Sequence, residues 1–351
     1  MASRELKALY SDVVRKVLQE TVHVTQGETV TVEAWNNGLP FAKRVIAEAR
    51  AAGCSAILIF EDERAYVEGV RKAPRETLGV MGNHEFALLS GTDAYIFVPG
   101  QALGVYSRTL KPEELADSTR YNSAWYEAAE KAKLRGARMT FGYVGKDMAK
   151  MLGKSVDAVV LGQMKACLAD SVEIRRTAGA VAPHLGDGAP LVIRSGDSEL
   201  SMTARGELNI EDGVVDESDV ESGNNVAYMP CGLVSKSIDS PSASGTLNIS
   251  PTLTKYGLVD EATLTFAEGV LSSWEGRGKK KLDALLNGTP TERRKLTSIN
   301  VGLNPLLRYG FGRDAFVKGA VTVGGFGFTA LVKRGDLLAR GREIVTAGSL
   351  E

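Results

Sequence analysis

ETVTVEAWNNGLPFAKRVIAEARAAGCSAILIF, residues 28–60, contains three secondary-structure signals in succession. Its first part, residues 28–34, alternates apolar and polar side chains, which is typical of a strand with one buried face. Residues 40–52 begin with proline and stop before Gly53, as helices commonly do. Residues 56–60 form a short apolar run that is typical of a buried strand. Strand, helix and strand in this order predict a parallel pair with a right-handed crossover.

The segments that follow extend the same pattern to about residue 150. We expect helices and strands in alternation at residues 64–71, 93–98, 112–134, 137–143 and 146–152. The prediction is an N-terminal α/β domain, residues 1–150, with a doubly wound parallel sheet. Ligands of such sheets bind at the carboxyl ends of the strands. No glycine-rich phosphate motif occurs there, and residues 35–38 (WNNG) predict only a turn.

The second half of the chain has a different pattern. A long helix is expected at residues 156–181. Alternating segments separated by Gly, Asp and Ser then predict hairpins of 190–195 with 199–204, 262–266 with 270–274, and 320–324 with 327–332. We therefore expect a C-terminal α+β domain, residues 151–351, that is rich in antiparallel hairpins.

Composition places the chain among ordinary globular proteins, with 44% hydrophobic and 24% charged residues. The net charge of −1 gives no general attraction to nucleic acid or anionic lipid. The apolar runs are too short to span a membrane, and the N-terminal residues predict an amphipathic helix, not a signal peptide. The three cysteines are scattered, which favours a reducing, cytoplasmic location. We expect no nucleic-acid and no membrane partner.

The common catalytic motifs are missing from this sequence. It contains no GxxxxGK[ST], no GxSxG and no HExxH, and its three histidines (His23, His84 and His184) lie in unrelated segments. Cys231, in MPCGLV, is either a nucleophile or a small buried apolar residue.

Several segments, in order, resemble the thermophilic metallo-aminopeptidases of the aminopeptidase T and aminopeptidase S type. Residues 224–239 (NNVAYMPCGLVSKSID) are similar to the family signature that contains P-x-G-E. Residues 26–34, 160–207, 262–286 and 299–305 are similar to other blocks of the family. The resemblance extends from residue 6 to about residue 332 and implies a divergent member of this family.

The resemblance implies a two-metal site in the second domain, built from two glutamates, two histidines and an aspartate, with a tyrosine nearby. In this chain the corresponding positions are Leu233, the region of Ser298, Ala320, the region of Phe326 for the tyrosine, and the regions of Thr329 and Leu331. No histidine follows His184, so the donors that such ions require are absent. The same argument applies to the related ring-cleaving dihydroxypyridine dioxygenases, whose iron site needs two histidines. We expect a degenerate metal site, no metal and no cofactor.

The first hypothesis is a metal-independent enzyme, hydrolase-like by descent, or a small-molecule-binding protein that uses the cleft between the domains. Its ligand would be a small molecule or a short peptide. The candidate catalytic residues are Cys231, Tyr309 and Arg308, and the candidate ligand-binding residues are Asn304, Asp314, Lys318, Phe326 and Leu233. Arg308 and Lys318 are suited to a carboxylate, and Tyr309 or Cys231 to an acid or a nucleophile. The apolar side chains favour an apolar or aromatic ligand.

Two alternatives remain open. The first is a metal-dependent aminopeptidase that releases N-terminal amino acids and uses Glu261, Glu268, Asp314 or Asp336 as donors. The second is a non-catalytic dimeric scaffold. A homodimer is expected from the resemblance alone.

Overall fold

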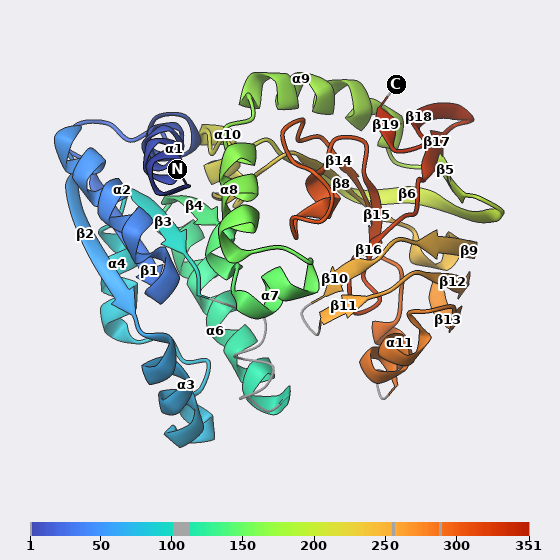
Figure 1. Cartoon of the computed structure of the whole chain (residues 1–351), viewed down its shortest axis with the longest axis horizontal. Helices are drawn as coiled ribbons and strands as arrows, with labels where there is room; N and C mark the ends of the chain where they lie inside the picture. The colour runs from blue at the N-terminus through green and yellow to red at the C-terminus, as the bar shows by residue number, and fades with distance from the viewer. Residues whose placement is uncertain (1, 101–111, 255–256, 288–289, 351) are drawn as a thin grey trace. The chain divides into compact units, whose positions relative to one another are not determined.

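The computed structural model describes residues 2–100, 112–254, 257–287 and 290–350 (Figure 1). The chain divides into two compact units. Unit 1 comprises Met1–Leu168 and Gly213–Pro230, and unit 2 comprises Ala169–Asp212 and Cys231–Glu351. This division differs from the boundary expected at residue 150, because the chain leaves unit 1 after residue 168 and later returns to it.

Unit 1 contains a five-stranded parallel sheet in the order β2-β1-β3-β4-β7. The strands are β1 (Thr29–Trp35), β2 (Ser55–Glu61), β3 (Ala94–Val98), β4 (Arg135–Met139) and β7 (Val226–Met229). All four neighbouring pairs are parallel. The predicted parallel sheet is therefore confirmed, and strand β7 is the part that the sequence did not predict.

Helices lie on both faces of this sheet. They are α1 (Ala2–Lys16), α2 (Leu39–Ala51), α3 (Glu63–Lys72), α4 (Asn83–Ser90), α6 (Pro112–Lys131), α7 (Lys146–Met151), α8 (Val156–Ala166) and α10 (Glu217–Glu221). On one face Val30, Val32, Ile96 and Met139 are at most 1% exposed, and α2 packs on β1 and β2. Successive side chains of a strand point to opposite faces of the sheet, so these buried apolar residues all lie on one face. This face forms the apolar core of unit 1.

The opposite face of the sheet has a different chemistry. Tyr95 on β3 forms a buried cluster with Leu89 of α4 and Ala129 of α6. Partly buried aromatic side chains of α6, Tyr121 and Trp125, pack against this cluster. Helix α6 therefore covers a polar and aromatic surface.

The helix predicted over residues 156–181 is wrong in one respect, because two helices occupy this stretch. Helix α8 ends at Ala166, and α9 (Ser171–Val181) begins anew in unit 2. The Asp170 carboxylate accepts a hydrogen bond from the amide of Val172 at 2.9 Å and so caps the second helix.

Unit 2 is rich in antiparallel strands, as predicted. Its strands are β5 (Pro190–Ser195), β6 (Ser198–Glu211), β8 (Leu233–Ile238), β9 (Ser244–Ile249), β10 (Thr252–Thr254), β11 (Gly257–Val259), β12 (Ala262–Ala267), β13 (Val270–Glu275), β14 (Ser298–Gly302), β15 (Val321–Gly324), β16 (Ala330–Leu331), β17 (Asp336–Ala339), β18 (Arg342–Thr346) and β19 (Ser349–Leu350). Helix α11 (Lys279–Leu286) follows β13. The three predicted hairpins are confirmed as β5–β6, β12–β13 and β15–β16.

Strand β6 joins two parts of the sheet in unit 2. It pairs with β5 and β9 through its first half and with β8 through its second half. An irregularity between Ala204 and Leu208 separates the two halves and redirects the strand. No described helix of either unit is long and apolar enough to cross a membrane.

Candidate ligand-binding site

Two of the predicted site residues contact each other inside unit 2. Cys231 is fully buried, and its thiol donates to the carbonyl of Asp212 at 3.2 Å. Asn304 is also fully buried, and its Nδ2 donates to the carbonyl of Cys231 at 2.7 Å. The other side-chain atom, Oδ1, accepts from the amides of Leu306 and Leu307, each at 3.0 Å. These contacts fix the loop after β14, and the predicted catalytic role of Cys231 stays a prediction.

The polar residues that follow Asn304 are more exposed. Arg308 is exposed, and Tyr309 is 49% exposed. Burial and the charge of Asp314 raise the pKa of Tyr309. Asp314 accepts a hydrogen bond from the amide of Gly310 at 2.9 Å, and Lys318 Nζ lies 3.6 Å from Glu173 Oε1. Their predicted roles toward a ligand also stay predictions.

The two apolar members of the predicted set lie in the sheet and the core. Leu233 is the first residue of β8 and pairs with Gly302 on β14 and Glu211 on β6. Phe326 is fully buried, and its ring centroid lies 5.3 Å from that of Phe266 and 4.8 Å from that of Phe328.

The donor set does not fit a metal centre. Among the described residues, no three His, Cys, Asp or Glu side chains lie close enough together to bind a metal ion. Of the alternative donors, Glu261 forms ion pairs with Arg277 at 2.8 Å and Lys333 at 3.2 Å. Asp336 accepts a hydrogen bond from the amide of Ala347 at 2.6 Å.

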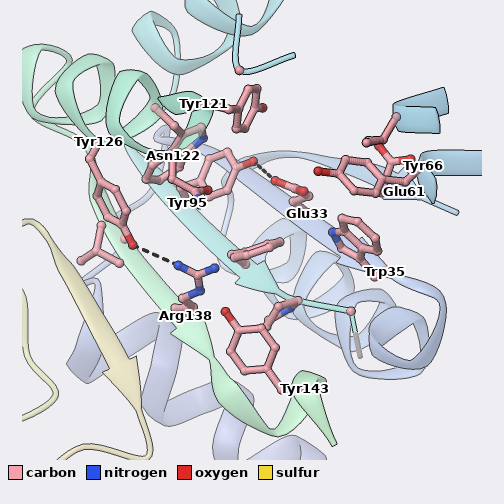
Figure 2. A pocket seen from close by; sticks show the side chains of 18 of the residues that line it. Glu33, Trp35, Glu61, Tyr66, Tyr95, Tyr121, Asn122, Tyr126, Arg138 and Tyr143 are labelled. Carbon is pink, nitrogen blue, oxygen red and sulfur yellow. Dashed lines mark hydrogen bonds between the residues drawn. The ribbon is translucent and has the colours of Figure 1, made fainter. Parts of the chain in front are cut away.

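A pocket of about 540 Å³ lies within unit 1, on the polar and aromatic face of the parallel sheet (Figure 2). We call it the unit-1 pocket. Its volume is in the range of small-molecule sites. Its aromatic lining consists of Trp35, Tyr66, Tyr95, Phe97, Tyr121, Trp125, Tyr126 and Tyr143, and its charged lining consists of Glu33, Glu61 and Arg138. None of the predicted site residues lines it.

The register of the strands explains why these side chains meet. Glu33 on β1 pairs with Phe97 on β3, and Phe97 pairs with Arg138 on β4. Paired residues of parallel strands present their side chains to the same face, so the three form one row across the sheet. Trp35 and Glu61 form the next pair toward the carboxyl ends of the strands. The pocket thus lies near the sheet edge where ligands of such folds bind.

Arg138 occupies the basic side of the unit-1 pocket. Its Cζ atom lies 4.9 Å from the ring centroid of Phe97 and 5.6 Å from that of Tyr143. Nη1 donates to the hydroxyl oxygen of Tyr126 at 3.0 Å, and this oxygen lies 2.5 Å from that of Tyr228. Burial lowers the pKa of Arg138, but the phenol groups of Tyr143 and its neighbours outweigh this effect and raise it. Arg138 therefore stays charged at every physiological pH.

Glu33 occupies the acidic side. Its carboxylate accepts a hydrogen bond from the hydroxyl of Tyr95 (Figure 2). Burial raises the pKa of Glu33, although the bond from Tyr95 opposes the shift. Burial and the charge of Asp62 raise the pKa of Glu61 as well. Two carboxyl groups that take up protons more readily than usual therefore face the same side of the pocket.

Aromatic rings form the walls between these two sides. The ring centroids of Trp35 and Tyr66 lie 5.0 Å apart, and those of Tyr95 and Trp125 lie 5.1 Å apart, both pairs edge to face. Tyr121 and Trp125 are four residues apart on α6, so they project from the same side of the helix. The Tyr121 hydroxyl donates to Glu85 of α4, which fixes its orientation.

This arrangement is suited to a flat organic molecule. In Figure 2, Arg138 lies on one side with Tyr126 and Tyr143, and Glu33 lies on the other with Trp35, Tyr66 and Glu61. Glu33 and Arg138 are separated by one intervening strand, which places their backbones about 10 Å apart. Aromatic rings can stack on a planar ligand, while the charged groups bind its ends.

The sequence offered a partial signal for this pocket. The alternation of residues 28–34 places Glu33 on the face opposite the apolar residues Val30 and Val32. Tyr95 and Phe97 alternate in the same way with Ile96, which is fully buried. A polar and aromatic face was therefore visible in each strand, but the neighbours of each strand were not.

Solved structures of other proteins have a fold similar to that of this chain. No protein-family model matches the chain, and no curated protein matches it. Among solved structures, AmpT from Thermus thermophilus is similar with a TM-score of 0.67 and 14% sequence identity, over 98% of this chain and 99% of that chain. The 2,5-dihydroxypyridine dioxygenase from Pseudomonas putida KT2440 is similar with a TM-score of 0.63 and 15% identity, over 100% of this chain and 98% of that chain. The chain has the two-domain aminopeptidase-like α/β fold expected from the sequence, and at these identities the likeness concerns the fold alone.

Proposed function

We propose that this protein binds a small organic ligand without a dinuclear metal centre, and that the ligand binds in the unit-1 pocket. The pocket itself is the observation behind this proposal, because it brings a guanidinium and two carboxyl groups together among aromatic side chains. Pockets of this size with few, convergent polar groups are typical of binding and active sites.

The donor chemistry of unit 2 supports the metal-independent part of the proposal. The positions where the family resemblance places metal ligands include Leu233, Ala320 and Leu331, whose side chains offer no donor atom. Leu233 is the first residue of β8, and Ala320 directly precedes β15. A ligand site in unit 1 needs none of these positions. The alternative location is the part of unit 2 that contains Cys231 and Tyr309.

A binding experiment with a pocket-filling variant tests the location. Chelator-treated protein is titrated with 2-naphthol, 2-naphthoate and 6-hydroxy-2-naphthoate by calorimetry. We expect at least one of these probes to bind with a stoichiometry of one and to lose binding in Val226→Trp, because Val226 lines the pocket. Val172→Trp is the matched control, since Val172 on α9 is 76% exposed. Binding that survives Val226→Trp, or no binding of any probe, would contradict the proposal.

The fold likeness to AmpT favours one alternative, a metal-dependent aminopeptidase. Metal analysis of purified protein separates the two functions. Two equivalents of zinc, cobalt or manganese, together with chelator-sensitive release of an amino acid from a reporter, would support the aminopeptidase. A metal-free protein that still binds the naphthyl probes would support our proposal.

The other alternative, a dimeric scaffold, predicts neither bound metal with peptidase activity nor binding of the naphthyl probes. A scaffold would bind no probe in the unit-1 pocket, and its size in solution would be that of a homodimer. Sedimentation analysis and the calorimetry above therefore distinguish all three functions.

A further inference from the structure

We infer that the unit-1 pocket selects an aromatic carboxylate that carries a hydroxyl or amino group at its far end. The carboxylate binds Arg138, the ring lies between the aromatic walls, and the far group donates to Glu33. This inference rests on the proposed function and names the ligand class of the same site.

The first argument concerns the charge of Arg138. Among the residues that the structure describes, no carboxylate forms an ion pair with this guanidinium, whose closest contacts are phenols and aromatic rings. Its Nε atom is buried and has no hydrogen-bond partner in the described part of the chain. A buried charge is costly unless it is paired and hydrogen-bonded. An anionic ligand would supply both.

The second argument concerns geometry. Guanidinium groups bind carboxylates through two parallel hydrogen bonds. Nη1 of Arg138 already donates one bond to Tyr126, which holds the side chain in place. The guanidinium lines the unit-1 pocket and forms no ion pair in the described part of the chain, so its charge remains for a ligand carboxylate. Arg138 is thus oriented before the ligand arrives, and little side-chain entropy is lost on binding.

The third argument concerns the opposite end. Glu33 uses one carboxylate oxygen, Oε2, to accept the bond from Tyr95. The Trp35 side chain also donates to this carboxyl group, a carboxylate can accept further bonds from a ligand, and Glu61 lines the same side of the pocket. Burial raises the pKa of both carboxyl groups and so disfavours their ionised forms. A ligand group that donates a hydrogen bond or carries a positive charge there would stabilise these ionised forms.

The unequal ends also disfavour other ligand classes. A dianion would place one negative group beside Glu33 and Glu61, where like charges repel. A neutral aromatic molecule would leave Arg138 without an anion. A cation without a carboxylate would use only the acidic side.

Three naphthalene probes separate the contributions of the two ends. We measure dissociation constants of 6-hydroxy-2-naphthoate, 2-naphthoate and 2-naphthol by calorimetry with the full chain. A hydrogen bond to a charged group corresponds to at least about a tenfold change in affinity. We therefore expect 6-hydroxy-2-naphthoate to bind at least about tenfold more tightly than 2-naphthol, and more tightly than 2-naphthoate.

Variants assign each preference to its residue. Arg138→Met should abolish the preference for the carboxylate, measured as the ratio of the affinities for 6-hydroxy-2-naphthoate and 2-naphthol, while Arg138→Lys should keep part of the preference. Glu33→Gln should reduce the preference for the hydroxyl group. Arg44→Met is the matched control, because Arg44 lies on α2 and forms an exposed pair with Glu48 at 3.1 Å.

The outcomes are distinct from those that test the proposed function. If wild-type protein binds 2-naphthol as tightly as 6-hydroxy-2-naphthoate and both are blocked by Val226→Trp, the inference is wrong and the proposed function stands. If no probe binds, both fail. If Arg138→Met does not fold, the comparison of the three probes in wild type and in Arg138→Lys still decides the inference.

Discussion

Replacing Asn304 with alanine tests whether this buried residue stabilises unit 2. In the structure its side chain forms hydrogen bonds with the carbonyl of Cys231 and with the amides of Leu306 and Leu307. The sequence predicted a ligand-binding role for the same residue. The two roles differ in what the substitution would change.

The expected loss follows from the groups that lose their partners. The bonds to the Cys231 carbonyl and the Leu307 amide are buried, whereas the amide of Leu306 is partly accessible to water. Each buried group left unsatisfied costs about 1–3 kcal/mol. We therefore expect Asn304→Ala to lower the free energy of unfolding by about 2–6 kcal/mol, a large share of the stability of a typical domain.

The assay must report on unit 2 alone. Trp274 lies on β13 of unit 2 and is 8% exposed, whereas Trp35 and Trp125 lie in unit 1. Urea unfolding followed by the fluorescence of Trp274, in a background with Trp35→Phe and Trp125→Phe, measures this transition. Asn209→Ala is the control, because Asn209 lies on β6 of unit 2 and is exposed.

The control should change the free energy of unfolding by no more than about 0.5 kcal/mol. A loss of the same small size in Asn304→Ala, combined with loss of ligand binding, would refute the structural role and restore the ligand-binding role. Loss of stability, together with unchanged binding of the naphthyl probes by Asn304→Ala in a chain that keeps Trp35 and Trp125, would support the structural role.

Three further predictions concern pH and packing. Because its pKa is raised, folded Glu33 binds a proton more tightly than unfolded Glu33, so wild type loses stability as pH rises from the usual glutamate pKa through the raised one. Glu33→Gln lacks this loss. The free energy of unfolding of the variant relative to wild type, measured with urea, should therefore be more favourable at about pH 8 than at about pH 4. Phe326→Ala should lower the free energy of unfolding by about 3–5 kcal/mol, because the ring is fully buried against Phe266; a loss below about 1 kcal/mol would contradict this. Gly269→Ala should lower the melting temperature, since φ is +78° and a Cβ would lie 2.0 Å from the Ser240 carbonyl oxygen; an unchanged value would show that the loop adapts.

The elements of the fold were largely predictable because their signals are local. Residues 28–60 gave β1, α2 and β2 within a residue or two of their observed ends. The hairpins of unit 2 were predictable for the same reason, since each joins neighbouring segments. By contrast, β7 pairs with β4 across about 90 residues of chain, and no local pattern in either strand indicates this partner.

The unit-1 pocket was not predictable, for a related reason. Its chemistry depends on the register that aligns Glu33, Phe97 and Arg138, which come from three separate strands. Alternation assigns each residue to a face of its own strand but not to a neighbour. Helix α6 adds Trp125 only because it packs over that face. The family resemblance, moreover, implies a site in unit 2 and none in unit 1.

Burial has opposite effects on stability at the expected metal positions of unit 2 and at the charged residues of the unit-1 pocket. In unit 2, three positions where the resemblance placed the metal site or its tyrosine are buried apolar residues: Ala320 is 1% exposed, Phe326 0% and Leu331 7%. Burial of such side chains stabilises the fold without any ligand. In unit 1, burial disfavours the ionised form of Glu33, and Arg138 keeps a buried Nε atom that has no hydrogen-bond partner in the described part of the chain. Groups whose burial is unfavourable and that converge on a pocket mark functional sites more often than well-packed apolar residues do. The chemistry of this protein is therefore to be sought first at Arg138 and Glu33.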